Sequence, residues 1–221
     1  MDQQTPTSPI VVDFYQRYLD DQDSAAFVKR VARVYTCATL ERLAVSGDRL
    51  GRRAAVLALG FMGDYTSNAV LGRALIDRDR GVRTIAENGI SEVWRRVGSR
   101  EQRLVLRNIV RLNQTKQYED AIRVASELIQ ESPWIAEAWC QRGTAYYHVG
   151  QYEASIRDCH QALEINPYHF TASAGMGQCY LLQENLPAAL EAFRRALRLN
   201  PNMEEVRAQV IRLQRSIERE G

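Results

Sequence analysis

The feature that most constrains this chain is a spacing of 34 residues that recurs through its C-terminal half. Pro133, Pro167 and Pro201 are separated by this interval. Between residues 136 and 169, aromatic and small residues lie at spacings typical of a helix, a tight turn and a second helix. A period of this length predicts helical hairpins that stack on one another, because one hairpin cannot bury its apolar face alone. The sequence therefore predicts an all-α fold, an α-solenoid.

These repeats resemble the tetratricopeptide repeat family. The copy at 136–169 supplies Trp139, Gly143, Tyr146, Ala162 and Pro167, and the copy at 170–203 supplies Gly177, Tyr180, Ala189, Phe193, Ala196 and Pro201. A third copy, at 102–135, matches weakly because Ile109 stands where the others have Gly. The resemblance implies stacked hairpins at 102–135, 136–169 and 170–203, wound as a right-handed superhelix.

Helix ends are also predicted within this half. Asn166-Pro167 and Asn200-Pro201 should each stop a helix, because Pro lacks an N–H and the residue before it avoids the α region. Pro187 suits the first turn of its helix. Residues 204–221 should form a capping helix with one apolar stripe, made of Val206, Val210, Leu213 and Ile217.

The N-terminal part has a different pattern. Residues 1–9 are expected to be a loose tail, and a short helix should follow from Ile10 to Leu19. Asp23 or Ser24 can cap the next helix. That helix is predicted to run as one piece to Ser46-Gly47, with an apolar stripe of Phe27, Val31, Val34, Ala38, Leu40 and Leu43.

A second repeat lies within residues 10–101. Asp48 and Asp79 are 31 residues apart, and Arg52 matches Arg83. This segment resembles the HEAT repeat, in the short form found in phycobilisome lyase-type proteins, although Gly51 stands where that pattern has Val. The resemblance implies that each Asp caps a helix and that the Arg reaches the neighbouring repeat's acidic turn. The expected order is HEAT-like repeats, then tetratricopeptide repeats.

Arginines are dense in the HEAT-like segment and have two interpretations. Arg49, Arg53, Arg78 and Arg80 could form a basic face for nucleic acid or phosphate. Alternatively, the arginines form ion-pair ladders with the acidic turns and a solvated face. The second interpretation is favoured because no aromatic residues are interleaved to stack bases. The net charge of +2 also gives no strong overall field.

Catalytic and metal-binding motifs are absent from the sequence. No GxGxxG, GxxxxGK[ST], HExxH or GxSxG is present, so we expect no enzyme activity and no cofactor. Cys37, Cys140, Cys159 and Cys179 form no CxxC pair and are interpreted as packing residues in a reducing compartment. His169 lies between two repeats and is expected at the surface. With no visible signal peptide or bilayer-spanning stretch, a soluble cytoplasmic protein is expected.

The family resemblance implies a concave groove lined by the first helix of each hairpin. Candidate partner-binding residues are Asn113, Cys140, Gln141, Thr144, Tyr147, His148, Thr171, Gln178 and Leu181. Tyr147 is the one large anchor, although it and Leu181 could instead pack against the neighbouring repeat. Some family members hold a carboxylate with Lys, Asn and Arg on these helices. Here those places hold Leu106, Val110, Gln141, Thr171 and Gly175, which argues against capture of an acidic chaperone tail.

The sequence thus predicts a non-enzymatic scaffold or adaptor that binds a peptide segment or helix of a protein partner in this groove. Two alternatives remain open. One is nucleic-acid or phosphate binding by the Arg-rich face, and the other is a role as accessory subunit of an enzyme complex. No motif specifies the partner's identity or an oligomeric state.

Overall fold

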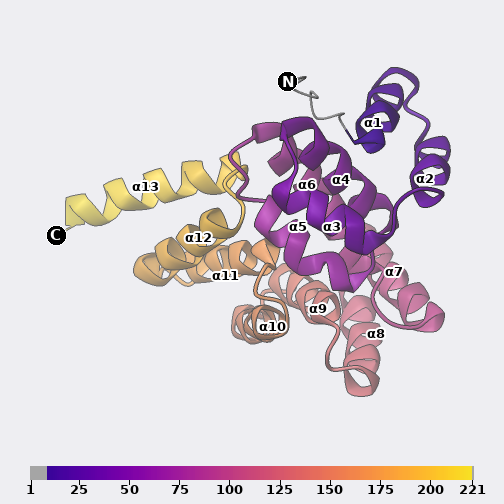
Figure 1. Ribbon diagram of the computed structural model, residues 1–221. Helices are drawn as coiled ribbons and strands as arrows, with labels where there is room; N and C mark the ends of the chain where they lie inside the picture. Colours follow the sequence, from indigo (N-terminus) through magenta and orange to yellow (C-terminus); the bar gives the residue numbers. More distant parts are fainter. Residues whose placement is uncertain (1–8, 221) are drawn as a thin grey trace, which may run out of the picture. The chain divides into compact units, whose positions relative to one another are not determined.

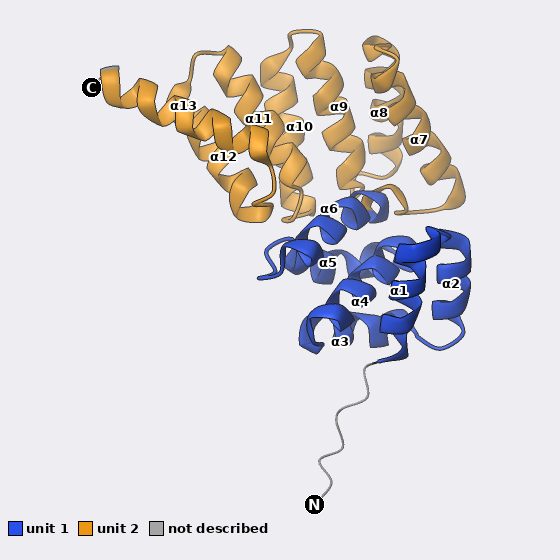
Figure 2. Ribbon diagram, turned by 90° about the horizontal axis from the view of Figure 1, so that it is seen from above, with its two compact units in different colours: residues 1–93 blue, residues 94–221 orange. Residues whose placement is uncertain are grey.

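The computed structural model describes residues 9–220, and these residues are helical without any strand (Figure 1). The expected tail at residues 1–9 lies outside this range except for Pro9. The chain divides into two compact units, residues 1–93 (unit 1) and residues 94–221 (unit 2), which Figure 2 colours separately. No helix in the described range is long and apolar enough to cross a membrane.

Unit 1 is formed by six α-helices and one 3-10 helix, and the last of them, α6, continues two residues past Val93. The elements are α1 (Ile10–Asp21), α2 (Ser24–Ala32), α3 (Cys37–Ser46), α4 (Arg49–Met62), η1 (Tyr65–Ser67), α5 (Asn68–Ala74) and α6 (Arg80–Arg95). As predicted, Asp23 caps α2, because its Oδ1 accepts a hydrogen bond from the Ala26 N–H at 2.9 Å.

The prediction of one long helix ending near Ser46 was wrong. The helix ends at Ala32, and a new helix begins at Cys37. Thr36 causes the restart, since its Oγ1 accepts from the Thr39 N–H at 3.3 Å and satisfies an otherwise unpaired helix-end donor. Val34 lies in the break and is 54% exposed, so it does not belong to the apolar stripe.

The core of unit 1 depends on close helix packing between α4 and α6. Phe27, Leu40, Leu59 and Leu71 are fully buried. A Cβ built on Gly89 would lie 2.8 Å from the Cα of Gly60, so the two backbones touch at this point. Small residues at this crossing allow an approach that any side chain would prevent.

Unit 2 is a row of helix pairs with one further helix. Its elements are α7 (Arg100–Gln114), α8 (Tyr118–Glu131), α9 (Ala136–His148), α10 (Tyr152–Ile165), α11 (Phe170–Leu182), α12 (Leu186–Leu199) and α13 (Glu204–Glu220). Each of these helices contacts the next one along the chain from α7 to α13. This arrangement of stacked hairpins is an α-solenoid, as the 34-residue spacing predicted.

The predicted helix ends in unit 2 are confirmed. α10 stops at Ile165, and Asn166 before Pro167 has extended backbone angles of φ −128° and ψ 96°. α12 stops at Leu199 in the same way, and Pro187 lies in its first turn. On α13, the stripe residues Val206, Val210 and Leu213 are buried in a cluster with Ala189, Phe193 and Ala196 of α12.

Candidate functional site: a pocket between three helices

A pocket of about 220 Å³ opens where α9, α10 and α11 of unit 2 meet. Its lining is mostly uncharged and combines small apolar groups with hydroxyl and amide groups. The lining residues are Cys140, Thr144, Tyr147 and His148 from α9, Ser155 and Cys159 from α10, and Thr171, Gly175 and Gln178 from α11.

Small residues create this space. A Cβ built on Gly143 would lie 3.1 Å from the Cys159 sulfur, and one built on Gly175 would lie 3.4 Å from the same atom. The Cys159 thiol therefore occupies the volume that larger side chains on α9 and α11 would fill. Because Gly143 has no side chain, α9 and α10 pack closely behind the pocket.

The structure brings six of the nine candidate partner-binding residues together at the pocket: Cys140, Thr144, Tyr147, His148, Thr171 and Gln178. Leu181 is not among the lining residues and packs instead against the α12–α13 core cluster. Asn113 and Gln141 also lie outside the lining. Sequence reasoning missed Ser155 and Cys159, because it considered only the first helix of each hairpin, and it missed Gly175 as a lining residue. The signal that could have identified them is that all three residues are small.

Tyr147 stands among other aromatic rings at the pocket. Its ring centroid is 6.0 Å from that of Tyr152 and 5.2 Å from that of His148. His148 in turn stacks on Tyr118, with centroids 4.5 Å apart and ring planes within 11°. Burial raises the pKa of the Tyr147 hydroxyl above its ordinary value, so it stays protonated and can donate a hydrogen bond.

A chain of polar contacts runs beside the pocket and links three successive first helices. The Asn113 side-chain NH₂ donates to the Gln141 carbonyl and side-chain oxygens, both at 2.9 Å. The Gln141 amide donates to Glu137 Oε1 at 2.8 Å, and Glu137 Oε2 lies 3.1 Å from His169 Nε2. His169 Nδ1 then lies 3.1 Å from Thr171 Oγ1 in the pocket wall. These contacts fix the spacing of α7, α9 and α11.

The expectation that His169 lies at the surface was wrong, because its side chain is fully buried. Its ring stacks on Trp94, with centroids 4.2 Å apart and planes within 19°. Burial by itself lowers the pKa of His169, but the Cys140 and Glu137 side chains beside it raise that pKa to about 10. The burial of His169 could not be predicted from its position in a turn, because Trp94 and Glu137, which contact its ring, are both distant in the sequence.

The cysteines near the pocket have no disulfide partner. Burial raises the pKa of the Cys140 thiol, and it raises that of Cys159 to about 12. Cys179 donates to Ser155 Oγ at 3.2 Å. Protonated thiols are weak nucleophiles and weak metal ligands, so these residues act as packing groups. Within residues 9–220, no group of three or more His, Cys, Asp or Glu side chains is arranged to hold a metal ion.

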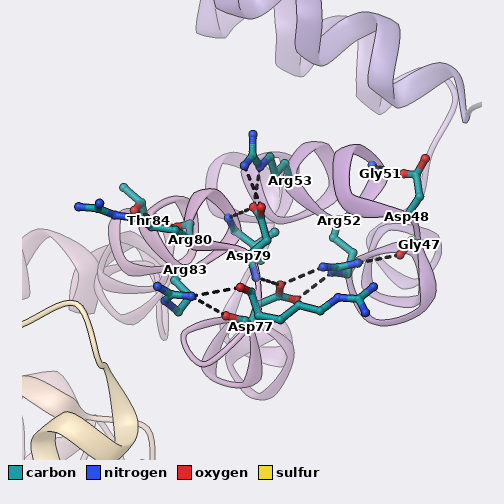
Figure 3. A network of polar contacts seen from close by, with 12 residues as sticks. Gly47, Asp48, Gly51, Arg52, Arg53, Asp77, Asp79, Arg80, Arg83 and Thr84 are labelled. Carbon is teal, nitrogen blue, oxygen red and sulfur yellow. Dashed lines mark hydrogen bonds and ion pairs between the residues drawn. The ribbon is translucent and has the colours of Figure 1, made fainter.

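The possible basic face of unit 1 is partly neutralised by acidic side chains (Figure 3). Arg53 makes two hydrogen bonds to Asp79, at 2.6 and 2.9 Å, and these bonds lower the pKa of Asp79 to about 2. Arg52 is bidentate to Asp77 at 2.8 and 3.0 Å. Arg49, Arg78 and Arg80 are exposed. Asp48 and Asp79 cap α4 and α6 as the HEAT-like pattern implies, by accepting from the N–H groups of Gly51 and Val82.

Comparison with known proteins confirms two of the three predicted tetratricopeptide repeats, and the copy at 102–135 stays a prediction. The tetratricopeptide repeat family model matches residues 136–169 and 172–203. A search of curated proteins found no match. The HEAT-like character of the N-terminal segment stays a prediction.

Solved structures of tetratricopeptide domains share the fold. The first such domain of Spaghetti (RPAP3), bound to the HSP90 peptide SRMEEVD, is 19% identical over 55% of this chain and 97% of its own length, with a TM-score of 0.52. The Arabidopsis OM64 domain is 21% identical over 52% of this chain and 95% of that chain, with a TM-score of 0.51. The first domain of human RPAP3 is 18% identical over 53% and 92%, with a TM-score of 0.50.

Proposed function

We propose that the protein is a non-enzymatic adaptor that binds a peptide segment or helix of a partner protein at the unit 2 pocket. The observation that carries the proposal is the convergence of Tyr147, Thr144, Thr171 and Gln178 on one partly apolar cavity. An aromatic anchor beside hydroxyl and amide groups is the composition that recognises a peptide side chain and its backbone.

The chemistry of the lining specifies the kind of side chain that would enter. None of the nine lining residues is Lys or Arg. The solved Spaghetti domain holds the peptide SRMEEVD, which is rich in carboxylates. A carboxylate entering the present pocket would lose its hydration without gaining a cation, which is costly. The partner's anchoring side chain is therefore uncharged and of moderate size.

The pocket wall is held rigid by the polar chain from Asn113 to Thr171. Preorganised walls reduce the entropy that binding would otherwise lose. Gln141 is engaged by Asn113 and Glu137, so it supports the wall and does not meet the partner. Thr144 and Gln178 are the groups placed to hydrogen-bond the partner.

Affinity capture with paired variants tests this function. The immobilised protein is compared with a Tyr147→Ala/Gln178→Ala variant, and bound proteins are identified with crosslinking and mass spectrometry. A matched control, Leu104→Ala/Gln130→Ala, removes an exposed aliphatic and an exposed amide from outside the pocket. We expect the control to retain the partners, with crosslinks on α9 and α11, and the pocket variant to lose them while keeping its helical circular dichroism. Retention of the same partners at unchanged affinity by the pocket variant would contradict the proposal.

A further inference from the structure

Two aliphatic side chains in unit 1 stand out by their exposure. Val45 is 61% exposed and Ile76 is 57% exposed, the highest values among the large hydrophobic residues of the described chain. They are 31 residues apart, which is the spacing of the unit 1 repeat, and each follows an exposed arginine by three residues. The pairs Arg42/Val45 and Arg73/Ile76 define what we call the α3/α5 surface.

α3 and α5 contact each other, and residues of both helices line an open groove of about 430 Å³. Ile76 follows the end of α5 and is not among the lining residues. The groove is lined by Ala38, Glu41, Arg42, Val45, Ser46, Val70 and Arg73. Leu40 and Leu71 fill the core on the other side of the same helices. Core packing therefore does not explain why Val45 faces outward. Together with Ala38 and Val70 it gives the groove a continuous apolar floor, and an apolar surface rimmed by polar residues marks an interaction site.

The charges on this surface differ from those deeper in unit 1. Arg52 and Arg53 are each paired with an aspartate. By contrast, neither Arg42 nor Arg73 makes an ion pair with any described residue. The Arg42 guanidinium donates one hydrogen bond, to the neutral Thr39 hydroxyl at 3.4 Å. The one acid in the groove, Glu41, accepts a hydrogen bond from the Ser67 hydroxyl at 2.8 Å. Two cations flank the groove against one carboxylate.

We propose that the α3/α5 surface binds an acidic segment of a partner protein, one in which an aliphatic side chain is flanked by carboxylates. Carboxylates complement Arg42 and Arg73, since a guanidinium can donate two parallel hydrogen bonds to one carboxylate. The partner's aliphatic side chain packs against Val45 and Val70 in the groove. Nucleic acid fits this surface less well because aliphatic groups offer no platform for base stacking. This surface belongs to unit 1 and selects an acidic segment, whereas the unit 2 pocket selects an uncharged side chain.

Binding to short synthetic peptides tests this inference on the full chain. The peptides carry a central Leu flanked by Asp and Glu, by Asn and Gln, or by Lys. Every protein also carries Tyr147→Ala/Gln178→Ala, so that the unit 2 pocket does not contribute. The test variant is Arg42→Glu/Arg73→Glu. The matched control is Arg78→Glu/Arg80→Glu, which reverses the same number of exposed charges within unit 1.

We expect the acidic peptide to bind about tenfold more tightly than the amide peptide, and the test variant to lose that advantage. The control variant should keep it, and added salt should weaken it. Equal binding of acidic and amide peptides would overturn the inference, as would an equal loss in the control variant, which would indicate a diffuse field. Dissociation of a wild-type dimer by Arg42→Glu/Arg73→Glu in light scattering would assign the surface to a second copy instead. Displacement of the acidic peptide by an RNA oligonucleotide through the same arginines would also overturn it.

Discussion

Unit 1 and unit 2 are both built from helix pairs, but they place their ion pairs differently. In unit 1, Arg52–Asp77 and Arg53–Asp79 join residues 25 and 26 apart and so link α4 to the turn before α6. In unit 2, the bidentate pair Arg142–Asp158 joins residues 16 apart, within a single hairpin. The buried Glu137–His169 contact also joins two successive repeats of unit 2, beside neutral hydrogen bonds such as Asn113–Gln141.

This difference has a functional consequence. Where arginines hold helices together, cations are already numerous and some, such as Arg42 and Arg73, remain for a partner. Where repeats are held by small residues, aromatic rings and one buried His–Glu contact, the face between first helices stays largely uncharged. The interactions that hold the helices of each unit together therefore account for the charge of its candidate binding surface.

Removing one of the paired acids of unit 1 should have the largest effect. Asp77→Ala leaves the Arg52 guanidinium, whose side chain is only 5% exposed, without its partner. We expect a loss of about 3–5 kcal/mol in the free energy of unfolding, because an unpaired buried charge is costly. Urea unfolding followed by circular dichroism measures the loss. Trp134 and Trp139 lie well inside unit 2, so in a Trp94→Phe background their fluorescence reports unfolding of that unit separately.

The double variant Asp77→Ala/Arg52→Met serves as the control for this prediction. It removes the stranded charge as well as the acid, so most of the lost stability should return. If Asp77→Ala alone costs less than about 1 kcal/mol, which is the range of exposed pairs, the ion pair does not hold the helices of unit 1 together.

A second prediction concerns close packing in unit 2. A Cβ at Gly177 would lie 2.5 Å from the Phe193 ring, and Phe193 is fully buried and cannot withdraw. Gly177→Ala should therefore cost about 1–3 kcal/mol. Gly175→Ala, two residues away on the same helix, meets only the Cys159 sulfur at 3.4 Å and should be neutral or slightly stabilising. Thermal unfolding of the two variants gives the comparison, and equal melting temperatures would disprove the packing argument.

The smallest expected effect is the pH dependence of the buried His169. Its folded-state pKa is raised from 6.5 to about 10, so the folded state binds this proton more tightly than the unfolded chain. The stability it contributes is complete below about pH 6.5 and is lost as pH rises toward 10. Because the Cys140 thiol is itself protonated over most of this range, only the contact with Glu137 contributes there, and we expect a pH-dependent change on the order of 1 kcal/mol. His169→Gln should flatten the decline of melting temperature above neutral pH, and an unchanged decline would show that the His169–Glu137 contact is not responsible.

Much of unit 2 could be predicted because its signals are local and repeated. Pro167 and Pro201 end helices through covalent geometry, and Gly143 and Gly177 mark close contacts through the absence of a side chain. Six residues of the pocket lining were named beforehand, because the family resemblance implies that the first helix of each hairpin lines the groove. The break between α2 and α3 was missed because an apolar stripe continues through it in the sequence. The Thr36 side-chain oxygen caps a new helix there, so the chain does not continue as one helix.

Local sequence signals specified the helical class, the repeat period, the helix ends at Pro167 and Pro201, and the mainly uncharged character of one helix face. These properties depend on residues within a turn or a hairpin of one another. Tertiary packing, by contrast, determines which arginines pair with acids and which small residues line the pocket. It also buries His169 against Glu137 and Trp94. Those outcomes depend on atoms brought together from distant parts of the chain, where packing and desolvation, and not local propensity, set the free energy.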